Sequence, residues 1–350
     1  MPRLSILIPF LGDRDSLENT LASVLQNRPE GAEIVVALSQ DYEDPYQLGE
    51  EVHFIRVEPE ASLVATLNQG FVACQAPIIH TLACGVTVGE GWADHARARF
   101  NDRRVASVAP LALQADDPER VWAAGLEYRP SGVVRRRGHG LLAESAAQLG
   151  GDLAGSDLAG PSLAAGFYRR AALGGVSPVF DPVLGPNFSD VDLALRLLAA
   201  GYTNVCEPSS LVFQPRLAAH SIDGWAQARQ AERMFWRHGS RHGWLHSLAA
   251  HLASVSGEFA GNLPRAKALV QLAGRCLAGC EWGSARRRSL QLALPRFAAP
   301  SEMIDAKQSG PDGPGRRLDR PHFELEARPG RAESRRQRTP LPSVNDRPSS

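Results

Sequence analysis

Short apolar runs alternate with segments of helical periodicity in the N-terminal part of the chain, and this alternation constrains the fold more than any other feature. The apolar runs cover residues 4–10, 32–38, 52–57, 77–84 and 105–113. Between them, residues 15–25 and 61–75 carry apolar side chains three and four positions apart, which is typical of amphipathic helices. Strands that alternate with helices predict βαβ units and a mostly parallel sheet. Because the runs are largely apolar at successive positions, we expect helices on both faces of that sheet.

Cap and turn signals mark the boundaries of further elements. Asp15, with Glu18 three residues later, predicts a capping box at the start of the first helix. The sequence Arg-Pro-Ser-Gly at 129–132 predicts the turn of a hairpin. Ser189 is expected to open a leucine-rich helix that ends at Gly201.

Beyond this first part the pattern predicts a less regular architecture. Residues 143–160, rich in Gly, Ala, Ser and Asp, predict a long loop, and residues 167–173 predict a helix. A last apolar run at 203–213 predicts a strand, and helical periodicity follows it. The C-terminal stretch is dominated by Pro, Gly, Ser and charged residues, which predicts disorder. We therefore expect an α/β domain at 1–220, a helical extension at 221–298 and a disordered tail at 299–350.

The charge and cysteine content exclude some classes of protein. The 350 residues include 38 basic and 38 acidic side chains, and this balance argues against a nucleic-acid-binding protein. Five scattered cysteines argue against a disulfide framework and for a reducing compartment. No apolar run is long enough to span a membrane, so we expect a cytoplasmic protein. The basic, tryptophan-bearing segment at 225–244 either packs over the sheet or makes a peripheral membrane contact.

Four stretches resemble, in chain order, the family 2 glycosyltransferases of the GT-A fold. They are LSILIPFLGDRDSLENTLASVLQ at 4–26, EIVVALSQD at 33–41, LNQGFVACQAPIIHTLACG at 67–85 and AAGFYRRAALGGVSPVFDPVLGPNFSDVDLALRLLAAGY at 164–202. The resemblance covers roughly residues 3–240 and implies an α/β fold of the GT-A type. It also implies transfer of a sugar from a nucleotide-sugar donor to a glycan, a lipid-linked or a protein acceptor, in polysaccharide or glycoconjugate synthesis.

The same resemblance implies a set of site residues. Asp190 matches the catalytic base of the family, which takes the proton of the acceptor hydroxyl, so that a single displacement would invert the anomeric carbon. Nucleotide-sugar contacts are expected for Pro9, Asn68, Cys84, Gly85, Arg136 and Asp192. Structural alternatives stay open: both acids suit a first helical turn, Asn68 suits a helix surface, and Cys84 suits a buried free thiol.

The carboxylates of the family's metal-binding Asp-x-Asp motif are missing from this chain. Ala83-Cys84-Gly85 stands in their place, and Gln214 stands where the family has a metal-binding histidine, although His220 is close in sequence. Hard divalent cations prefer oxygen ligands, which these three side chains do not supply. We therefore expect a degenerate motif and a protein that uses no divalent metal. Arg136, in the Arg135–Arg137 run, would then face the donor phosphates, unless the run is ordinary solvated charge.

Two functions of other classes are weighed against the transferase. Because the acids are missing, the chain could be a catalytically inactive relative that binds a sugar nucleotide, a glycan or a partner protein. A Rossmann-type dinucleotide enzyme is disfavoured, since no Gly-x-Gly-x-x-Gly turn follows the first strand.

Overall fold

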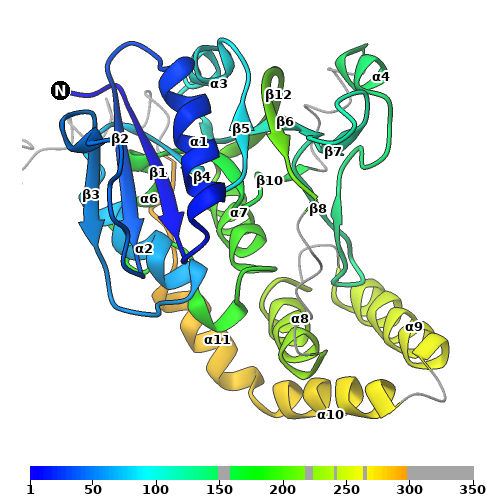
Figure 1. Cartoon of the computed structure of the whole chain (residues 1–350). Helices are drawn as coiled ribbons and strands as arrows, with labels where there is room; N and C mark the ends of the chain where they lie inside the picture. The colour runs from blue at the N-terminus through cyan, green and yellow to red at the C-terminus, as the bar shows by residue number, and fades with distance from the viewer. Residues whose placement is uncertain (149–157, 217–223, 240–242, 263–265, 298–350) are drawn as a thin grey trace, which may run out of the picture. The chain divides into compact units, whose positions relative to one another are not determined.

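A large mixed sheet organises the part of the chain that the structure describes. This computed structural model describes residues 1–148, 158–216, 224–239, 243–262 and 266–297. Within these ranges nine strands form one sheet, in the order β3 (Val52–Arg56), β2 (Ala32–Leu38), β1 (Leu4–Phe10), β4 (Ile78–Leu82), β11 (Ala165–Arg169), β6 (Val105–Gln114), β12 (Thr203–Gln214) and β5 (Thr87–Val88), with β7 (Val121–Ala123) paired to β6. Strands β3, β2, β1 and β4 are parallel, whereas β11 is antiparallel to both β4 and β6 (Figure 1).

Alternate residues of β1 pack against opposite helical layers. Ile6 and Ile8 lie in a core with α1 (Arg14–Gln26) and α3 (Trp92–Arg99). Leu7 lies in a second core with α2 (Leu63–Ala73), α6 (Arg170–Leu173) and α7 (Ser189–Ala199). Successive side chains of a strand face opposite sides of a sheet, so a strand that is apolar at every position needs two covering layers. The predicted α/β architecture with helices on both faces is confirmed.

The helix predicted at 167–173 is wrong over its first three residues. Residues up to Arg169 form the central strand β11, and only the short α6 is helical. Phe167 and Tyr168 both pair with β4 and β6, which are distant in sequence. Pairing with two neighbours decides this conformation, and a short apolar run does not reveal it. The loop predicted at 143–160 also contains α4 (Ala143–Gln148) and β10 (Leu158–Gly160), while residues 149–157 lie outside the described ranges.

The cap predicted for α1 is displaced by two residues. Asp13, not Asp15, is the N-cap, and its carboxylate accepts a hydrogen bond of 3.2 Å from the backbone N–H of Ser16. Glu18 pairs with Arg14 at 2.7 Å instead of closing a capping box. Both aspartates suit a helix start, and only the backbone path selects between them.

The predicted hairpin is confirmed. β8 (Leu126–Tyr128) and β9 (Val134–Arg136) pair antiparallel, and β10 joins β8 in a small second sheet. Gly132 closes the turn with a φ of +84° and donates its N–H to the carbonyl of Arg129 at 2.8 Å. A φ in this region favours glycine, and the glycine of the Arg-Pro-Ser-Gly sequence therefore predicts the turn.

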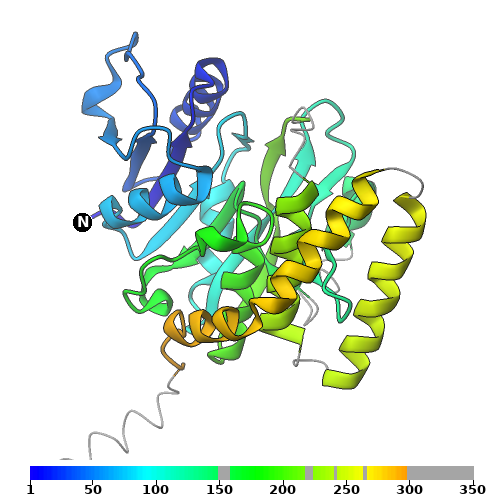
Figure 2. The ribbon, with the colours of Figure 1, turned by 90° about the horizontal axis from the view of Figure 1, so that it is seen from below.

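The predicted C-terminal helices are also present. They are α8 (Gly224–His238), α9 (Trp244–Asn262), α10 (Ala266–Cys280) and α11 (Trp282–Gln291). Helices α10 and α11 pack on α8, and Figure 2 shows α10 lying over it. Residues 1–298 form one compact unit, and the tail predicted from 299 onward lies outside the described residues. In the described ranges no helix is long and apolar enough to cross a membrane.

Candidate functional site

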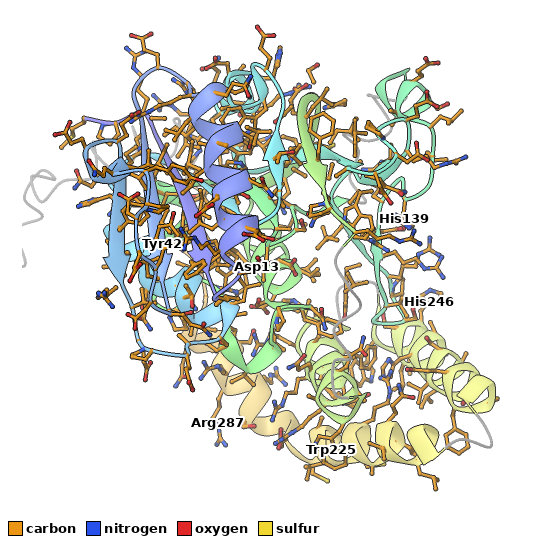
Figure 3. All side chains as sticks on the ribbon, viewed as in Figure 1. Asp13, Tyr42, His139, Trp225, His246 and Arg287 are labelled. Carbon is orange, nitrogen blue, oxygen red and sulfur yellow. The ribbon has the colours of Figure 1, made fainter. Side chains whose placement is uncertain are left out.

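The carboxyl ends of β1, β2 and β4 meet at one edge of the sheet, where open α/β sheets bind ligands. The hydroxyl of Ser39, after β2, donates a hydrogen bond of 2.9 Å to the carbonyl of Phe10, at the end of β1. The thiol of Cys84, after β4, donates one of 3.1 Å to the carbonyl of Pro9. Asp13 and Tyr42 lie at this edge in Figure 3, and the ring of Tyr42 packs edge-on against Phe10 at 5.5 Å.

Residues 83–85 directly follow β4 and form its tip, which hydrogen bonds to neighbouring segments hold in place. The N–H of Ala83 donates to the carbonyl of Ala164 at 2.8 Å. The N–H of Gly85 donates to the carbonyl of Ser16 at 2.9 Å and to the hydroxyl of Thr20 at 2.8 Å, with a φ of +87° at the glycine. This backbone donor is therefore already engaged by α1. A phosphate at this tip would need other donors.

Burial makes Cys84 a poor ligand and a poor nucleophile. It raises the pKa of the thiol to about 12, so the sulfur stays protonated at neutral pH. The hydrogen bond to Pro9 gives the thiol a packing role between β4 and β1. Pro9 itself is buried within β1. The structure thus gives Pro9 and Cys84 a structural function. The contact that each is predicted to make with the nucleotide sugar stays a prediction.

Asp190 is linked to this tip by a short chain of hydrogen bonds. Its carboxylate accepts hydrogen bonds from the N–H of Leu163 at 3.0 Å and the N–H of Val191 at 2.7 Å. Leu163 immediately precedes Ala164, the acceptor for Ala83. The side chain is 5% exposed, and burial raises its pKa to about 6, although the backbone hydrogen bonds oppose the rise. A carboxylate with such a pKa is ionised at pH 7 and more basic than an ordinary aspartate, which suits a general base.

Asp192, two residues later, has an entirely different environment. It is fully buried and pairs with Arg196 and Arg237, each at 2.9 Å, while His238 lies 2.9 Å away. Although burial opposes it, the hydrogen bond from His238 and the arginine charges hold the pKa of Asp192 well below its usual range. The carboxylate joins α7 to α8 in an ion network, and the nucleotide-sugar contact expected for Asp192 stays a prediction.

Asn68 also makes structural contacts instead of facing open space. Its amide nitrogen donates to the carbonyl of Phe180 at 2.8 Å, and its amide oxygen accepts the N–H of the same residue at 2.9 Å. Both polar atoms are thereby used to fix the segment that precedes α7. The predicted nucleotide contact of Asn68 stays a prediction.

Arg136 lies on β9, and its guanidinium stacks 3.9 Å from the centre of the Trp122 ring. Among the described residues it has no carboxylate partner, and no described contact joins it to residues 83–85. Its contact with donor phosphates stays a prediction. The Trp122–Arg136 pair was missed in the sequence because the two residues are separated by the whole hairpin.

The described residues do not themselves assemble a metal site. No group of three or more His, Cys, Asp or Glu side chains in these ranges could hold an ion, and Gln214 is buried at the end of β12. His220 lies outside the described residues. The side chains at the tip of β4 therefore do not fit a cation.

Comparison with known proteins shows the fold. No family model and no curated protein matches the chain. A crystal structure of GalNAc-T7 with UDP, GalNAc and Mn²⁺ is similar, with a TM-score of 0.50 and 15% identity over 67% of this chain and 48% of that one. A mannosyltransferase from Pyrobaculum calidifontis in complex with GDP-Man and Mn²⁺ has a TM-score of 0.46 and 14% identity over 83% of this chain and 85% of that one. The chain thus spans about half the length of GalNAc-T7 and has the GT-A fold of glycosyltransferases. Membership of family 2 stays a prediction.

The comparison with GalNAc-T7 corrects one expectation. That structure contains Mn²⁺, which contradicts the prediction of a protein without a divalent metal. The described residues do not themselves identify ligands for such an ion.

Proposed function

We propose that this protein is a glycosyltransferase that moves a sugar from a nucleoside-diphosphate donor to the hydroxyl of an acceptor. The observation that carries the proposal is the position of Asp190, a buried carboxylate held by backbone N–H groups beside the tip of β4. The donor would lie along the edge formed by β1, β2 and β4. The natural context would be the synthesis of a polysaccharide or glycoconjugate.

Asp190 would act as the general base. Its carboxylate would take the proton of the acceptor hydroxyl while the oxygen attacks the anomeric carbon. The new bond joins that carbon to the acceptor oxygen, and the bond to the diphosphate oxygen breaks, so the nucleoside diphosphate leaves. A single displacement of this kind inverts the anomeric configuration. The hydrogen bonds from Leu163 and Val191 would keep the carboxylate oriented throughout.

A binding protein without turnover is the second candidate. It is favoured by the tip of β4, where residues 83–85 offer no carboxylate and the N–H of Gly85 is already bonded to α1. Such a protein would bind a sugar nucleotide and leave it intact.

A thermal-shift screen of nucleotide sugars, with and without Mn²⁺, separates the two candidates when it is followed by a donor-turnover assay. A ligand that binds the folded state raises the unfolding midpoint. Stabilisation followed by release of the nucleoside diphosphate supports the transferase. Stabilisation without turnover, unchanged in an Asp190→Asn variant, supports the binding protein, and no stabilisation by any nucleotide sugar contradicts both.

We also propose that α10 and α11 contact an anionic lipid surface. Apolar side chains are exposed along these helices, with exposed fractions of 62% for Leu269, 42% for Leu277 and 73% for Leu290. Arg286 and Arg287 are exposed beside them. The one acid between 266 and 291, Glu281, is paired with arginines of α8. An apolar surface with cations and no free acid is complementary to anionic lipid headgroups.

A further inference from the structure

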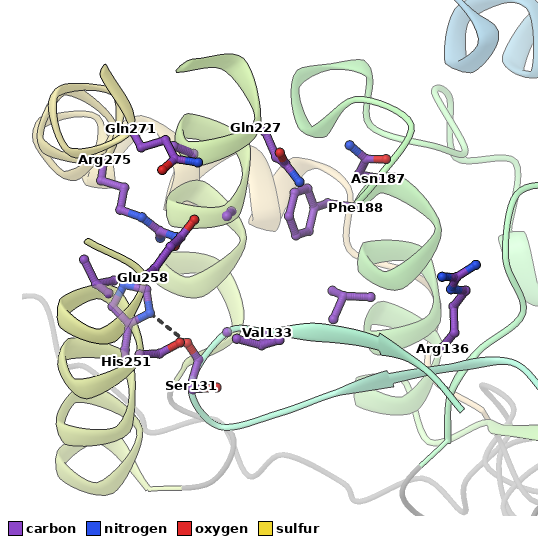
Figure 4. A pocket seen from close by; sticks show the side chains of 16 residues that line it. Ser131, Val133, Arg136, Asn187, Phe188, Gln227, His251, Glu258, Gln271 and Arg275 are labelled. Carbon is purple, nitrogen blue, oxygen red and sulfur yellow. Dashed lines mark hydrogen bonds and ion pairs between the residues drawn. The ribbon is translucent and has the colours of Figure 1, made fainter. Parts of the chain in front are cut away.

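A pocket of about 530 Å³ lies between the β8–β9 turn, the start of α7 and the three helices α8, α9 and α10. Figure 4 shows its side chains from close by. The lining residues that matter for its chemistry are Arg136, Asn187, Phe188, Gln227, His251 and Glu258. None of them was predicted as an acceptor contact, because they come from segments far apart in sequence.

One end of the pocket is closed by groups that satisfy one another. His251 Nδ1 lies 2.8 Å from the carbonyl of Ser131, and its Nε2 lies 3.0 Å from the carboxylate of Glu232. Both nitrogens of the imidazole are therefore engaged by groups of the protein. Arg275 pairs with Glu232 at 3.3 Å and with Glu258 at 2.6 Å. This ion cluster joins the hairpin turn to α8, α9 and α10.

The other end offers unused binding groups. Arg136 has no carboxylate partner among the described residues and lies 3.5 Å from His139 Nε2, and the buried amide nitrogen of Asn187 has no hydrogen-bond partner among them. Figure 4 shows Asn187 and Arg136 at the same end, with Phe188 beside Asn187. A buried donor without an acceptor destabilises the protein, and a ligand that accepts from it would relieve that cost. A cation, an amide side chain and an aromatic ring therefore line one pocket.

We propose that this pocket binds the acceptor, and that the acceptor is a saccharide bearing a carboxylate; this inference rests on the proposed function. Asn187 and Phe188 directly precede α7, the helix that carries Asp190, so a saccharide bound here would lie beside the start of that helix. A sugar hydroxyl would accept from Asn187, and the apolar face of the ring would pack on Phe188.

The charge of the pocket determines which acidic group on the saccharide is bound. A guanidinium binds a carboxylate through two parallel hydrogen bonds. Arg136, the lining cation that has no carboxylate partner among the described residues, offsets the one charge of a uronic acid but not the nearly double charge of a phosphomonoester. Stacking on Trp122 holds the guanidinium in place for this contact.

Isothermal titration calorimetry of the full chain, without nucleotide, tests the inference with two probes. One is a disaccharide that ends in glucuronic acid, and the other is its neutral glucose counterpart. We expect the acidic disaccharide to bind at least about tenfold tighter. Arg136→Gln should remove that preference, and Asn187→Ala should weaken both probes.

Arg135→Gln is the matched control. Adjacent residues of a strand face opposite sides, and Arg135 is not part of the pocket lining. It should leave both affinities unchanged. Equal affinities for the two probes, no binding of either, or an acidic preference that survives Arg136→Gln would overturn the inference. So would an Arg136→Gln variant that loses affinity for the nucleotide sugar and not for the disaccharide.

The outcomes also separate this inference from the proposed function. If the protein binds the acidic disaccharide through Arg136 but never glycosylates it, the inference about the pocket holds and the proposed transferase function fails. If the protein transfers sugar to acceptors with no dependence on Arg136, the proposed transferase function holds and the inference about the pocket fails.

Discussion

The backbone N–H of Leu163 donates a hydrogen bond of 3.0 Å to the carboxylate of Asp190, although 27 residues separate the two along the chain. This contact places the start of α7 against the segment that enters β11. Since the next residue, Ala164, accepts a hydrogen bond from Ala83, the base and the tip of β4 belong to one continuous arrangement.

The buried state of Asp190 makes the stability of the protein depend on pH. Its pKa is about 6 when folded, above the value of about 3.9 expected when unfolded. The folded protein therefore takes up a proton that the unfolded chain does not, and this contribution to stability is present at low pH and lost as pH rises through 6. Between pH 7.5 and pH 5 we expect the wild type to gain about 1 kcal/mol in unfolding free energy relative to Asp190→Asn. Denaturant unfolding at the two pH values measures it, and parallel changes in both proteins would show that Asp190 titrates normally.

Asp192→Asn should destabilise the fold far more than a comparable surface change. It leaves Arg196 and Arg237 buried without their shared carboxylate, which costs about 3–5 kcal/mol. Asp94→Asn is the control, because Asp94 pairs with Arg97 at 3.0 Å but is 67% exposed, and its loss should cost less than about 1 kcal/mol. Urea denaturation compares the two variants. Similar costs would mean that the buried network contributes no more than a surface pair.

Gly70→Ala tests the close packing of α2 on the sheet. A Cβ at this position would lie 2.4 Å from Leu7 Cδ1 and 3.3 Å from the Cβ of Ala37. We expect overpacking to cost about 1–3 kcal/mol. At Gly257 in α9 nothing lies within 4 Å, so Gly257→Ala should instead stabilise the helix by about 0.5–1 kcal/mol. Thermal unfolding of both variants should give shifts of opposite sign, and a neutral Gly70→Ala would refute the close contact.

The lipid contact proposed for α10 and α11 predicts selective vesicle binding. The full chain should sediment with vesicles of mixed phosphatidylglycerol and phosphatidylcholine and much less with pure phosphatidylcholine, with binding reduced by salt. Leu269→Ser with Leu277→Ser should weaken binding severalfold. Val72→Ser, at a residue of α2 that is 77% exposed, should not. Equal binding to both vesicle types would contradict the proposal, as would a dimer in solution that the same leucine substitutions separate.

The sequence alone predicted the elements whose signals are local. The strand bounds of β1 and β2 agree with their apolar runs, and the turn at Gly132 agrees with its Pro-Ser-Gly signal. The strand β11 was missed because its conformation depends on β4 and β6, which pair with it from distant parts of the chain.

The candidate site was predictable only in part, because only some of its residues carry a signal that is local in the sequence. Asp190 lies at a predicted helix start within the stretch 164–202 that resembles the glycosyltransferase family, so the sequence indicated it. Its partner Leu163 carries no such signal. Asp192 carries the same signal in sequence, yet Arg237, 45 residues later, gives it a structural role. Two acids in one helical turn thus differ in their surroundings, and only the fold shows which is paired.

The transfer rate of Asp190→Asn measures the proposed chemistry without intermediaries. The assay uses the nucleotide sugar that stabilises the protein, with Mn²⁺ present, and follows release of the nucleoside diphosphate in the presence of acceptor. Loss of a general base should lower the rate roughly 100-fold or more, while the donor still raises the unfolding midpoint as in the wild type. A variant that binds the donor and turns it over within about threefold of the wild-type rate would contradict the assignment of Asp190 as the base.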